Sequence, residues 1–352
     1  MLIATVGFVV LDRYQTGQQA GCAKELTDVR GVIGSEKEAY FADQRVRDRF
    51  ACAGLRITID TTGSLEMVQA LKNNRYGFAF PGSSATAQKI MTERQLTDSY
   101  TPFSSPMAVA TFKPIVEVLR RAGAIVPSGG RDAVDVAKLI DLAQQSTAWD
   151  QLPGNTEYAQ RKTVLLRTTD PQDSNSGLMF LSIVSHVANG GSVVTTPEQI
   201  GKLMPALCRL VFDQGEQVDT SQVLFNTYLT GGAGQVPLGL IYEAQFVAEA
   251  PGLKPQLSDD MVMLFPKPTV YSRHTVIPID DTGRRVVQAL RDDPELARLA
   301  AEHGFRPERP IDNPVSRRTP PVDVVDSPSY EVFESMLAAV APSTENARRC
   351  AK

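Results

Sequence analysis

The sequence is poor in the residues on which catalytic and metal centres most often depend. Its 352 residues include three histidines, one tryptophan and four cysteines. It contains no G-x-S-x-G, H-E-x-x-H or Walker A sequence, the patterns of a nucleophile elbow, a zinc protease and a phosphate-binding loop. An enzyme is therefore the weaker hypothesis. It would require His186, His274 or His303, or a pair of carboxylates, to lie in a cleft with a strongly shifted pKa.

The cysteines form no C-x-x-C pair, which argues against a zinc site and against thioredoxin-like chemistry. We expect no metal and no cofactor. Cys208 lies in the apolar run 203–211 and is expected in the core. Four cysteines allow three pairings, and if a disulfide exists, we expect it between Cys22 and Cys52.

The sequence also has no excess of basic over acidic residues. The net charge is −4, whereas a protein that binds nucleic acid needs clustered Lys and Arg. The hydrophobic fraction of 42% and the charged fraction of 22% are ordinary for a globular protein. The length suggests two domains of about 150 residues each, so a sizeable core is available without cross-links.

No apolar run at the N-terminus is long enough to span a bilayer, which takes about 20 residues. Residues 1–11 are uncharged and apolar, but they lack the basic start of a secretory signal. They indicate the remnant of a signal or anchor, and the alternative is a short strand or tail. Small residues precede Cys22, as in lipoproteins, although Gln19 replaces the usual aliphatic residue. We expect export, with the protein secreted or held on the outer face of the cytoplasmic membrane, and Cys22 is a candidate for lipidation.

From residue 28 onward, short apolar strands alternate with helices, a pattern that predicts βαβ units and a parallel sheet. The first half is expected to contain strands 29–33, 55–60 and 76–80, helices 36–53 and 65–72, and a helix that ends at Met91. Later segments predict strands 105–111, 163–168, 237–242, 261–265 and 269–271, and helices 114–122, 132–145, 174–189, 197–212, 283–303 and 329–340.

Gly-Ser pairs stand at three successive junctions between a strand and a helix: Gly34-Ser35, Gly63-Ser64 and Gly82-Ser83. A related junction, 173–176, follows in the second half. A serine there can cap a helix, and the free amides of a helix N-terminus can also hold a polar ligand group. In open α/β sheets, ligands bind beyond the carboxyl ends of the strands, where all these loops lie. The repetition favours a binding site.

The segments Gly34-Ser35-Glu36-Lys37, Thr62-Gly63-Ser64, Ser105-Pro106-Met107, Ser174-Asn175-Ser176 and Ile241-Tyr242-Glu243 resemble those of bacterial extracellular solute-binding proteins. The likeness covers roughly residues 29–305 and rests on the order and placement of the loops. It implies an α/β, two-lobed type II periplasmic-binding-protein fold, with a ligand cleft between the lobes and crossing strands at 106–113 and 261–272.

By this resemblance, a tail over 1–27 precedes a discontinuous first lobe (28–108 and 266–305), a second lobe (109–265) and a C-terminal extension (306–352). The implied ligand-binding residues are Gly34, Ser35, Glu36, Thr62, Gly63, Ser64, Ser83, Ser84, Ser174, Asn175, Ser176, Tyr242 and Glu243, with no catalytic residue among them.

The resemblance implies a monomer that captures a small polar solute for a permease of the ABC-transporter type. A ligand sensor of the same fold is an alternative, since closure of two lobes can also act as a switch. The charge of the solute stays open between an oxyanion and an amine. Glu36 and Glu243 would repel an anion if they face the cleft, but Glu36 also suits the first turn of a helix.

Overall fold

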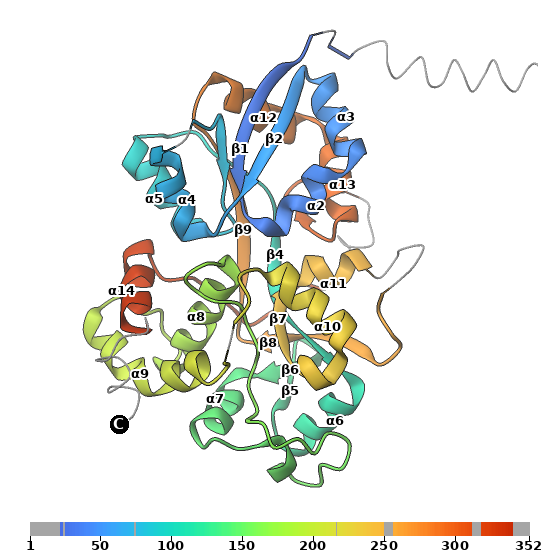
Figure 1. Ribbon diagram of the computed structural model, residues 1–352, viewed down its shortest axis with the longest axis vertical. Coiled ribbons are helices and arrows are strands. Elements are labelled where there is room, and N and C mark those ends of the chain that lie inside the picture. Colours follow the sequence, from blue (N-terminus) through green and yellow to red (C-terminus); the bar gives the residue numbers. More distant parts are fainter. Residues whose placement is uncertain are drawn as a thin grey trace, which may run out of the picture.

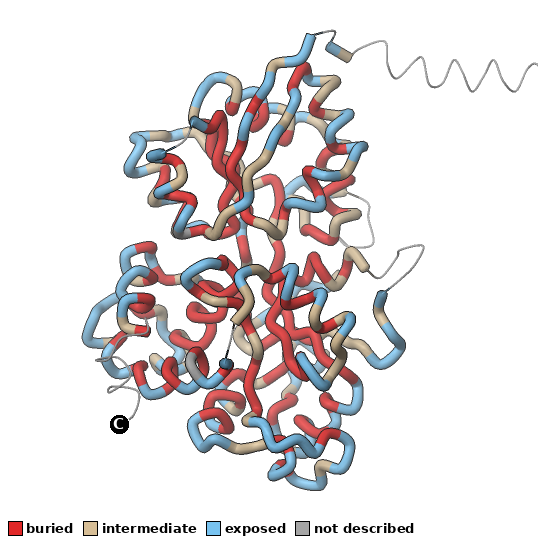
Figure 2. The backbone as a smooth tube through the Cα atoms, in the orientation of Figure 1, coloured by how far each residue is buried: buried red, intermediate tan, exposed pale blue. Residues whose placement is uncertain are grey.

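The protein consists of two lobes that lie one above the other along its long axis, joined by two long strands (Figure 1). The computed structural model describes residues 22–23, 25–73, 75–215, 217–249, 256–311 and 318–340. The apolar segment 1–11 and Cys350 therefore lie outside the described residues. In both lobes, buried strands run through the centre and exposed helix faces form the outside (Figure 2).

The upper lobe begins with three parallel strands. Its sheet places β1 (Thr27–Ile33) between β2 (Leu55–Thr61) and β3 (Phe78–Phe80), so that all three carboxyl ends point toward the lower lobe. Each strand leads directly into a helical segment at that edge. The helical segments of this lobe are η1 (Ser35–Lys37), α2 (Glu38–Ala42), α3 (Gln44–Cys52), α4 (Ser64–Asn73), α5 (Ser84–Arg94), α12 (Asp281–Asp292) and α13 (Pro294–Glu302).

Two antiparallel strands, β4 (Tyr100–Phe112) and β9 (Thr269–Pro278), connect the lobes (Figure 1). They pair from Tyr100 opposite Val276 to Pro106 opposite Tyr271. Because β9 also pairs antiparallel with β3, the sheet is mixed and not purely parallel as predicted. The second crossing strand, β9, starts later than predicted. Residues 261–267 form a separate strand of the lower lobe, β8 (Met261–Lys267), and Pro268 lies between β8 and β9.

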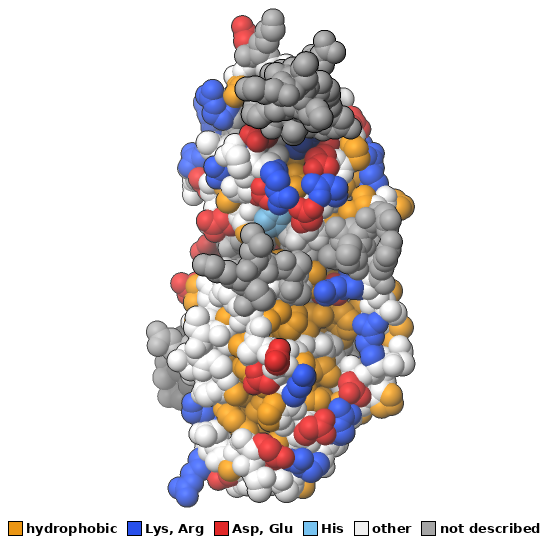
Figure 3. Space-filling model, turned by 90° about the vertical axis from the view of Figure 1, so that its right-hand side faces the viewer, with side chains coloured by type: hydrophobic (Ala, Val, Ile, Leu, Met, Phe, Trp, Pro, Cys, Tyr) orange, Lys and Arg blue, Asp and Glu red, His pale blue; other side chains and the backbone are white. Residues whose placement is uncertain are grey.

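The lower lobe is built on the far half of β4, which pairs with both β7 (Gly239–Tyr242) and β8. A hairpin of β5 (Ile125–Ser128) and β6 (Arg131–Asp135) extends this sheet through β8. The helical segments of this lobe are α6 (Lys113–Arg121), α7 (Val136–Gln144), η2 (Trp149–Gln151), α8 (Asn175–Ala188), α9 (Pro197–Phe212), α10 (Ser221–Gln235) and α11 (Glu243–Glu249). On the face shown in Figure 3, hydrophobic side chains gather over this lobe, whereas charged side chains of both signs cover the upper one.

Several predicted elements differ from the structure for local reasons. The helix predicted over 36–53 is interrupted at Asp43, whose side chain caps α3 instead of continuing α2. The helix predicted over 283–303 is likewise divided at Asp293, the N-cap of α13, which Pro294 follows. The start of the helix predicted at 132 is strand β6, because Gly129 and Gly130 adopt positive φ and turn the chain back into a hairpin.

In the lower lobe, one further prediction failed and one helix was missed. The segment 163–168 forms only isolated bridges, from Thr163 to Ala148 and from Arg167 to Gly239, and no regular strand. Helix α10 was not predicted, although Thr220 is a good N-cap whose side chain accepts from the Val223 amide. Its glycine-rich end, 231–234, weakened the helical pattern.

The end of the described chain returns to the region between the lobes. The short strand β10 (Arg306–Pro307) pairs with β4, and β11 (Val324–Val325) pairs with β9. Helix α14 (Tyr330–Val340), close to the predicted 329–340, lies on the lower lobe beside α9. No described helix combines the length and the apolar composition needed to cross a bilayer.

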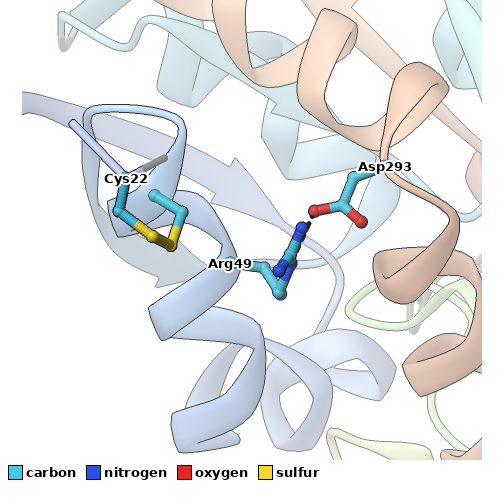
Figure 4. Close-up of a disulfide and its surroundings, with 4 residues drawn as sticks. Cys22, Arg49 and Asp293 are labelled. Carbon is cyan, nitrogen blue, oxygen red and sulfur yellow. Dashed lines mark hydrogen bonds and ion pairs between the residues drawn. A yellow bond between two sulfur atoms is a disulfide. The ribbon is translucent and has the colours of Figure 1, made fainter. Parts of the chain in front are cut away.

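The expected disulfide between Cys22 and Cys52 is present and ties the start of the described chain to the end of α3 (Figure 4). The nearby ion pair of Arg49 with Asp293, at 2.7 Å, joins α3 to the returning segment. Cys208 is buried, as predicted, and is also disulfide-bonded. A sulfur in a disulfide cannot carry a lipid thioether, so the bond and lipidation of Cys22 exclude each other.

Replacing Cys22 and Cys52 together by serine is expected to lower the free energy of unfolding by about 3.5 kcal/mol. The disulfide closes a loop with a sequence separation of 30 residues, and opening a loop of this size adds that much conformational freedom to the unfolded chain. Urea unfolding of the double variant measures the change. An unchanged free energy of unfolding would contradict this prediction.

Candidate functional site

A cavity of about 390 Å³ lies between the lobes, at the edge where β1 and β2 end. The upper lobe contributes the loops that follow these strands, and the lower lobe contributes the N-termini of α8 and α10. Of the predicted ligand-binding residues, those that line the cavity are Gly34, Ser35, Glu36, Thr62, Gly63, Ser64, Ser174 and Asn175. The lining residues that sequence reasoning missed are Thr61, Glu66, Asp173, Asp219 and Thr220. Asp219 and Thr220 were missed because α10 was not predicted.

The lobes are in contact around this cavity, so the cleft is closed. A Cβ atom on Gly63 would lie 2.1 Å from the carbonyl oxygen of Asp173 in the opposite lobe, far inside contact distance. A Cβ atom on Gly82 would lie 2.9 Å from the side-chain nitrogen of Asn175. The absence of a side chain at these two junctions therefore permits the close approach of the lobes.

Three predicted serines do not line the cavity. Ser83 is buried and caps α5, where its hydroxyl accepts from the Thr86 amide at 3.3 Å. Ser84 lines a different cavity, between α5 and the C-terminal segment 324–331. Ser176 is buried beneath the site, and its hydroxyl contacts those of Thr169 and Ser174 at 2.7 and 2.9 Å. Ser83 therefore has the ordinary role of a serine at a helix start, which is to cap the helix.

Tyr242 and Glu243 also lie behind the cavity wall. The hydroxyl of Tyr242 accepts a hydrogen bond from Asn175 at 2.9 Å. Glu243 is buried and is bound by Arg306, which reaches its two carboxylate oxygens at 2.6 and 2.8 Å. The prediction that Glu243 faces a ligand was wrong, because β10 places Arg306 against this carboxylate.

Beneath the cavity, Glu36, Lys37 and His274 form a buried charged cluster. The carboxylate of Glu36 contacts the Lys37 ammonium and lies 3.3 Å from Nδ1 of His274. The ammonium lies 3.2 Å from the same ring nitrogen and 5.1 Å from the centre of the Phe80 ring. Lys37 and His274 are fully buried. A buried charge needs a partner, and here the partner residues come from η1 and from β9.

Burial and the neighbouring charges shift the pKa of each group in the cluster. Burial opposes ionisation of Glu36, but the positive charge of Lys37 and the contact with His274 outweigh it, and the pKa of Glu36 lies well below its usual range. Burial, opposed by the charge of Glu36, lowers the pKa of Lys37. Burial and the nearby Lys37 charge lower the pKa of His274 to about 4. At neutral pH the imidazole is therefore uncharged.

A chain of hydrogen bonds determines the orientation of Asn175. The Ser272 hydroxyl donates its only proton to the carbonyl of Gly82 at 2.7 Å, so it can only accept from Asn175, 3.3 Å away. The side chain of Asn175 must therefore direct Nδ2 toward Ser272 and Tyr242. Its Oδ1 atom has no hydrogen-bond partner among the described residues.

The order Ser272, His274, Glu36 resembles that of a catalytic triad, with Ser272 Oγ 3.4 Å from Nε2 of His274. Four features argue against that role. The serine proton is donated to Gly82, both residues are fully buried, and neither lines the cavity. An imidazole with a pKa of about 4 is also a weak base at neutral pH. We assign these residues to the support of the cavity floor.

Carboxylates surround the entrance of the cavity. Glu66, Asp173 and Asp219 are exposed lining residues, and none of the three forms an ion pair within the described chain. Partial burial and the negative charges of Asp170, Glu66 and Asp219 raise the pKa of Asp173. Among the described lining residues there is no Lys or Arg, so the entrance is negatively charged.

Comparison with solved structures identifies the fold. AfuA of Actinobacillus pleuropneumoniae, a periplasmic binding protein solved with fructose-6-phosphate, is 13% identical, with 94% of this chain and 97% of that chain covered and a TM-score of 0.54. A ferric binding protein of Bordetella is 12% identical, with 92% and 99% covered and a TM-score of 0.52. The sulfate-binding protein SubI of Mycobacterium tuberculosis H37Rv is 12% identical, with 81% and 88% covered and a TM-score of 0.50.

No family model matches the sequence, and no curated protein is similar to it in sequence. The structural neighbours confirm the predicted α/β, two-lobed fold of periplasmic binding proteins. At these identities they carry no information about the ligand of this chain.

The free energy of unfolding is expected to fall as the pH is lowered from about 6.5 to about 4. The pKa of His274 is about 4 in the folded protein and about 6.5 when unfolded, so the unfolded chain binds more protons in this range. Glu36 acts in the same direction below about pH 4.5, because folding lowers its pKa.

Urea unfolding at a series of pH values, with the wild type and a His274→Gln variant, measures this dependence. The variant is expected to lose less stability over the same interval, since it has no imidazole to protonate. Equal slopes for the two proteins would exclude His274 as the source.

Proposed function

We propose that the protein is an exported solute-binding protein that closes its two lobes over a small polar solute. The observation that carries the proposal is the cavity itself, enclosed by loops of both lobes that meet where Gly63 approaches Asp173. A site divided between two lobes is open to solvent when they separate, and it encloses the solute when they approach. Crossing strands such as β4 and β9 allow this movement with little change inside each lobe.

The cavity has features of a binding site. Its volume of about 390 Å³ is in the range of small-molecule pockets. The N-termini of α4, α8 and α10 lie at the cavity. Ser174, the N-cap of α8, makes no side-chain capping bond, so the backbone amides at the start of α8 are available to a ligand.

Export and delivery to an ABC permease complete the proposal. The disulfide between Cys22 and Cys52 supports export, since such bonds persist mainly in oxidising compartments. AfuA, the structural neighbour described above as a periplasmic binding protein, supports a role in transport. We propose that the protein acts as a monomer, which leaves the lobes free to open.

A thermal-shift screen of the purified protein against amines, amino acids, sugars, oxyanions and divalent metals tests the proposal. A ligand at about 100 times its dissociation constant adds about 2.7 kcal/mol of stability, which is visible as a rise in melting temperature. At least one class is expected to give this shift. A screen in which no class raises the melting temperature would contradict solute binding.

Replacing Gly63 by alanine is expected to weaken binding of any ligand found in the screen by roughly tenfold, because the added methyl group overpacks the contact with Asp173 and opposes closure. The melting temperature of the empty protein should change little, since the open lobes do not meet there. Calorimetric titration measures the affinity. Gly201→Ala is the matched control, as a Cβ atom there meets open space, and equal affinities for both variants would contradict closure at Gly63.

A further inference from the structure

We propose that residues 324–340, named the strap here, form a third connection between the lobes and favour their closed arrangement. The strap is attached to the lower lobe along its length and enters the core of the upper lobe at one point, the first residue of α14. This inference rests on the lobe movement of the proposed function and is independent of which solute binds.

Most of the strap is attached to the lower lobe. Its first residues form β11, which pairs with the first residues of β9. The hydroxyl oxygen of Ser327 then lies 3.3 Å from that of Ser182 on α8. In α14, the side chains of Phe333, Met336 and Val340 are buried in the main hydrophobic core, where the helix packs beside α9. The strap therefore moves with the lower lobe.

The first residue of α14 belongs instead to the core of the upper lobe. Tyr330 is only 6% exposed and lies in a hydrophobic cluster whose other members come from β1, β3, α4, α5 and neighbouring parts of that lobe. The ammonium of Lys89 on α5 lies 5.1 Å from the centre of the Tyr330 ring and 3.3 Å from the carboxylate of Glu331. In Figure 1, α14 lies on the lower lobe below α5. One helix therefore contributes to the cores of both lobes.

The contact between the strap and the upper lobe is small. A cavity of about 670 Å³ lies beside it, between α5, β9 and residues 324–331, and both Lys89 and Tyr330 line this cavity. A contact of one ring and one ion pair can break and form again as the lobes move. Separation of α5 from α14 would return the Tyr330 ring to water, which costs free energy in proportion to the apolar area exposed.

The strap contact exists in the closed arrangement, in which Gly63 approaches Asp173. A contact that is made when the lobes are closed and lost when they open raises the fraction of closed molecules. The solute then has less free energy of closure to supply, so its apparent affinity rises with the fraction of molecules that are already closed. The strap thus adjusts affinity from outside the cavity between the lobes.

The separation of the lobes in the solute-free protein tests the inference. Nitroxide labels on Gln69→Cys in α4 and Thr230→Cys in α10, both at exposed positions, report this separation by double electron–electron resonance. With the strap intact, a measurable fraction of molecules is expected at the short distance of the closed arrangement. Tyr330→Ala is expected to lower the ratio of closed to open molecules at least about tenfold, the effect of removing one large buried side chain.

Three further variants identify the cause of the change. Tyr330→Phe keeps the ring in the cluster and should leave the ratio within about threefold of the wild type. Lys89→Ala leaves the hydrophobic cluster intact and should lower the ratio about threefold. Tyr76→Ala is the matched control, because Tyr76 is 7% exposed in the same cluster but belongs to the upper lobe itself. It should lower the melting temperature and leave the ratio unchanged.

The outcomes separate the strap from the proposed function. A closed fraction that stays the same or rises in both Tyr330→Ala and Lys89→Ala would overturn the strap. An equal fall in Tyr76→Ala would also overturn it, since a weakened upper lobe would then be the cause. So would a solute-free wild type without closed molecules. A thermal screen without any ligand would overturn solute binding, and it would leave in place a strap that passes these tests.

Discussion

The buried charge of Glu36 is the constraint on which the arrangement between the lobes depends. A carboxylate at this depth requires a compensating cation, and Lys37 supplies it from the next position in the chain. The ammonium in turn requires the ring nitrogen of His274 on β9. The first loop of the upper lobe is thereby bound to a strand that crosses between the lobes. Removing any one of the three residues would leave a buried polar group without its partner.

The same network reaches the lower lobe through hydrogen bonds. Ser272, two residues before His274 on β9, connects the Gly82 carbonyl of the upper lobe to Asn175 of the lower lobe. Glycine at position 82 leaves space where Glu36, Asn175 and Ser272 converge. The charged cluster therefore supports the cavity floor, and Ser272 orients the side chain of Asn175. Glu66, Asp173 and Asp219 set the sign of the charge at the entrance. The residues that support the cavity floor are therefore different from the carboxylates at the cavity entrance.

Much of the site could be predicted from sequence because its elements are local. The loops after β1 and β2 and the start of α8 follow directly from strand and helix patterns, and all three line the cavity. The errors concern residues whose role depends on partners distant in the chain. Glu243 was placed in the cleft because nothing near it in the sequence indicates its pairing with Arg306, 63 residues away. The burial of Lys37 was not predicted, because its partner His274 lies 237 residues away.

The sequence by itself determined which segments form strands and helices, where polar loops follow the strands, and that Cys22 and Cys52 are candidates for a disulfide. These features depend on periodicity, turn residues and composition, which operate over a few positions. Only the tertiary structure decided which strands cross between the lobes, which carboxylates are neutralised and which face the cavity. The physical reason is that the charge state and exposure of a side chain depend on what packs against it, and β9, β10 and α10 bring those neighbours from distant parts of the chain.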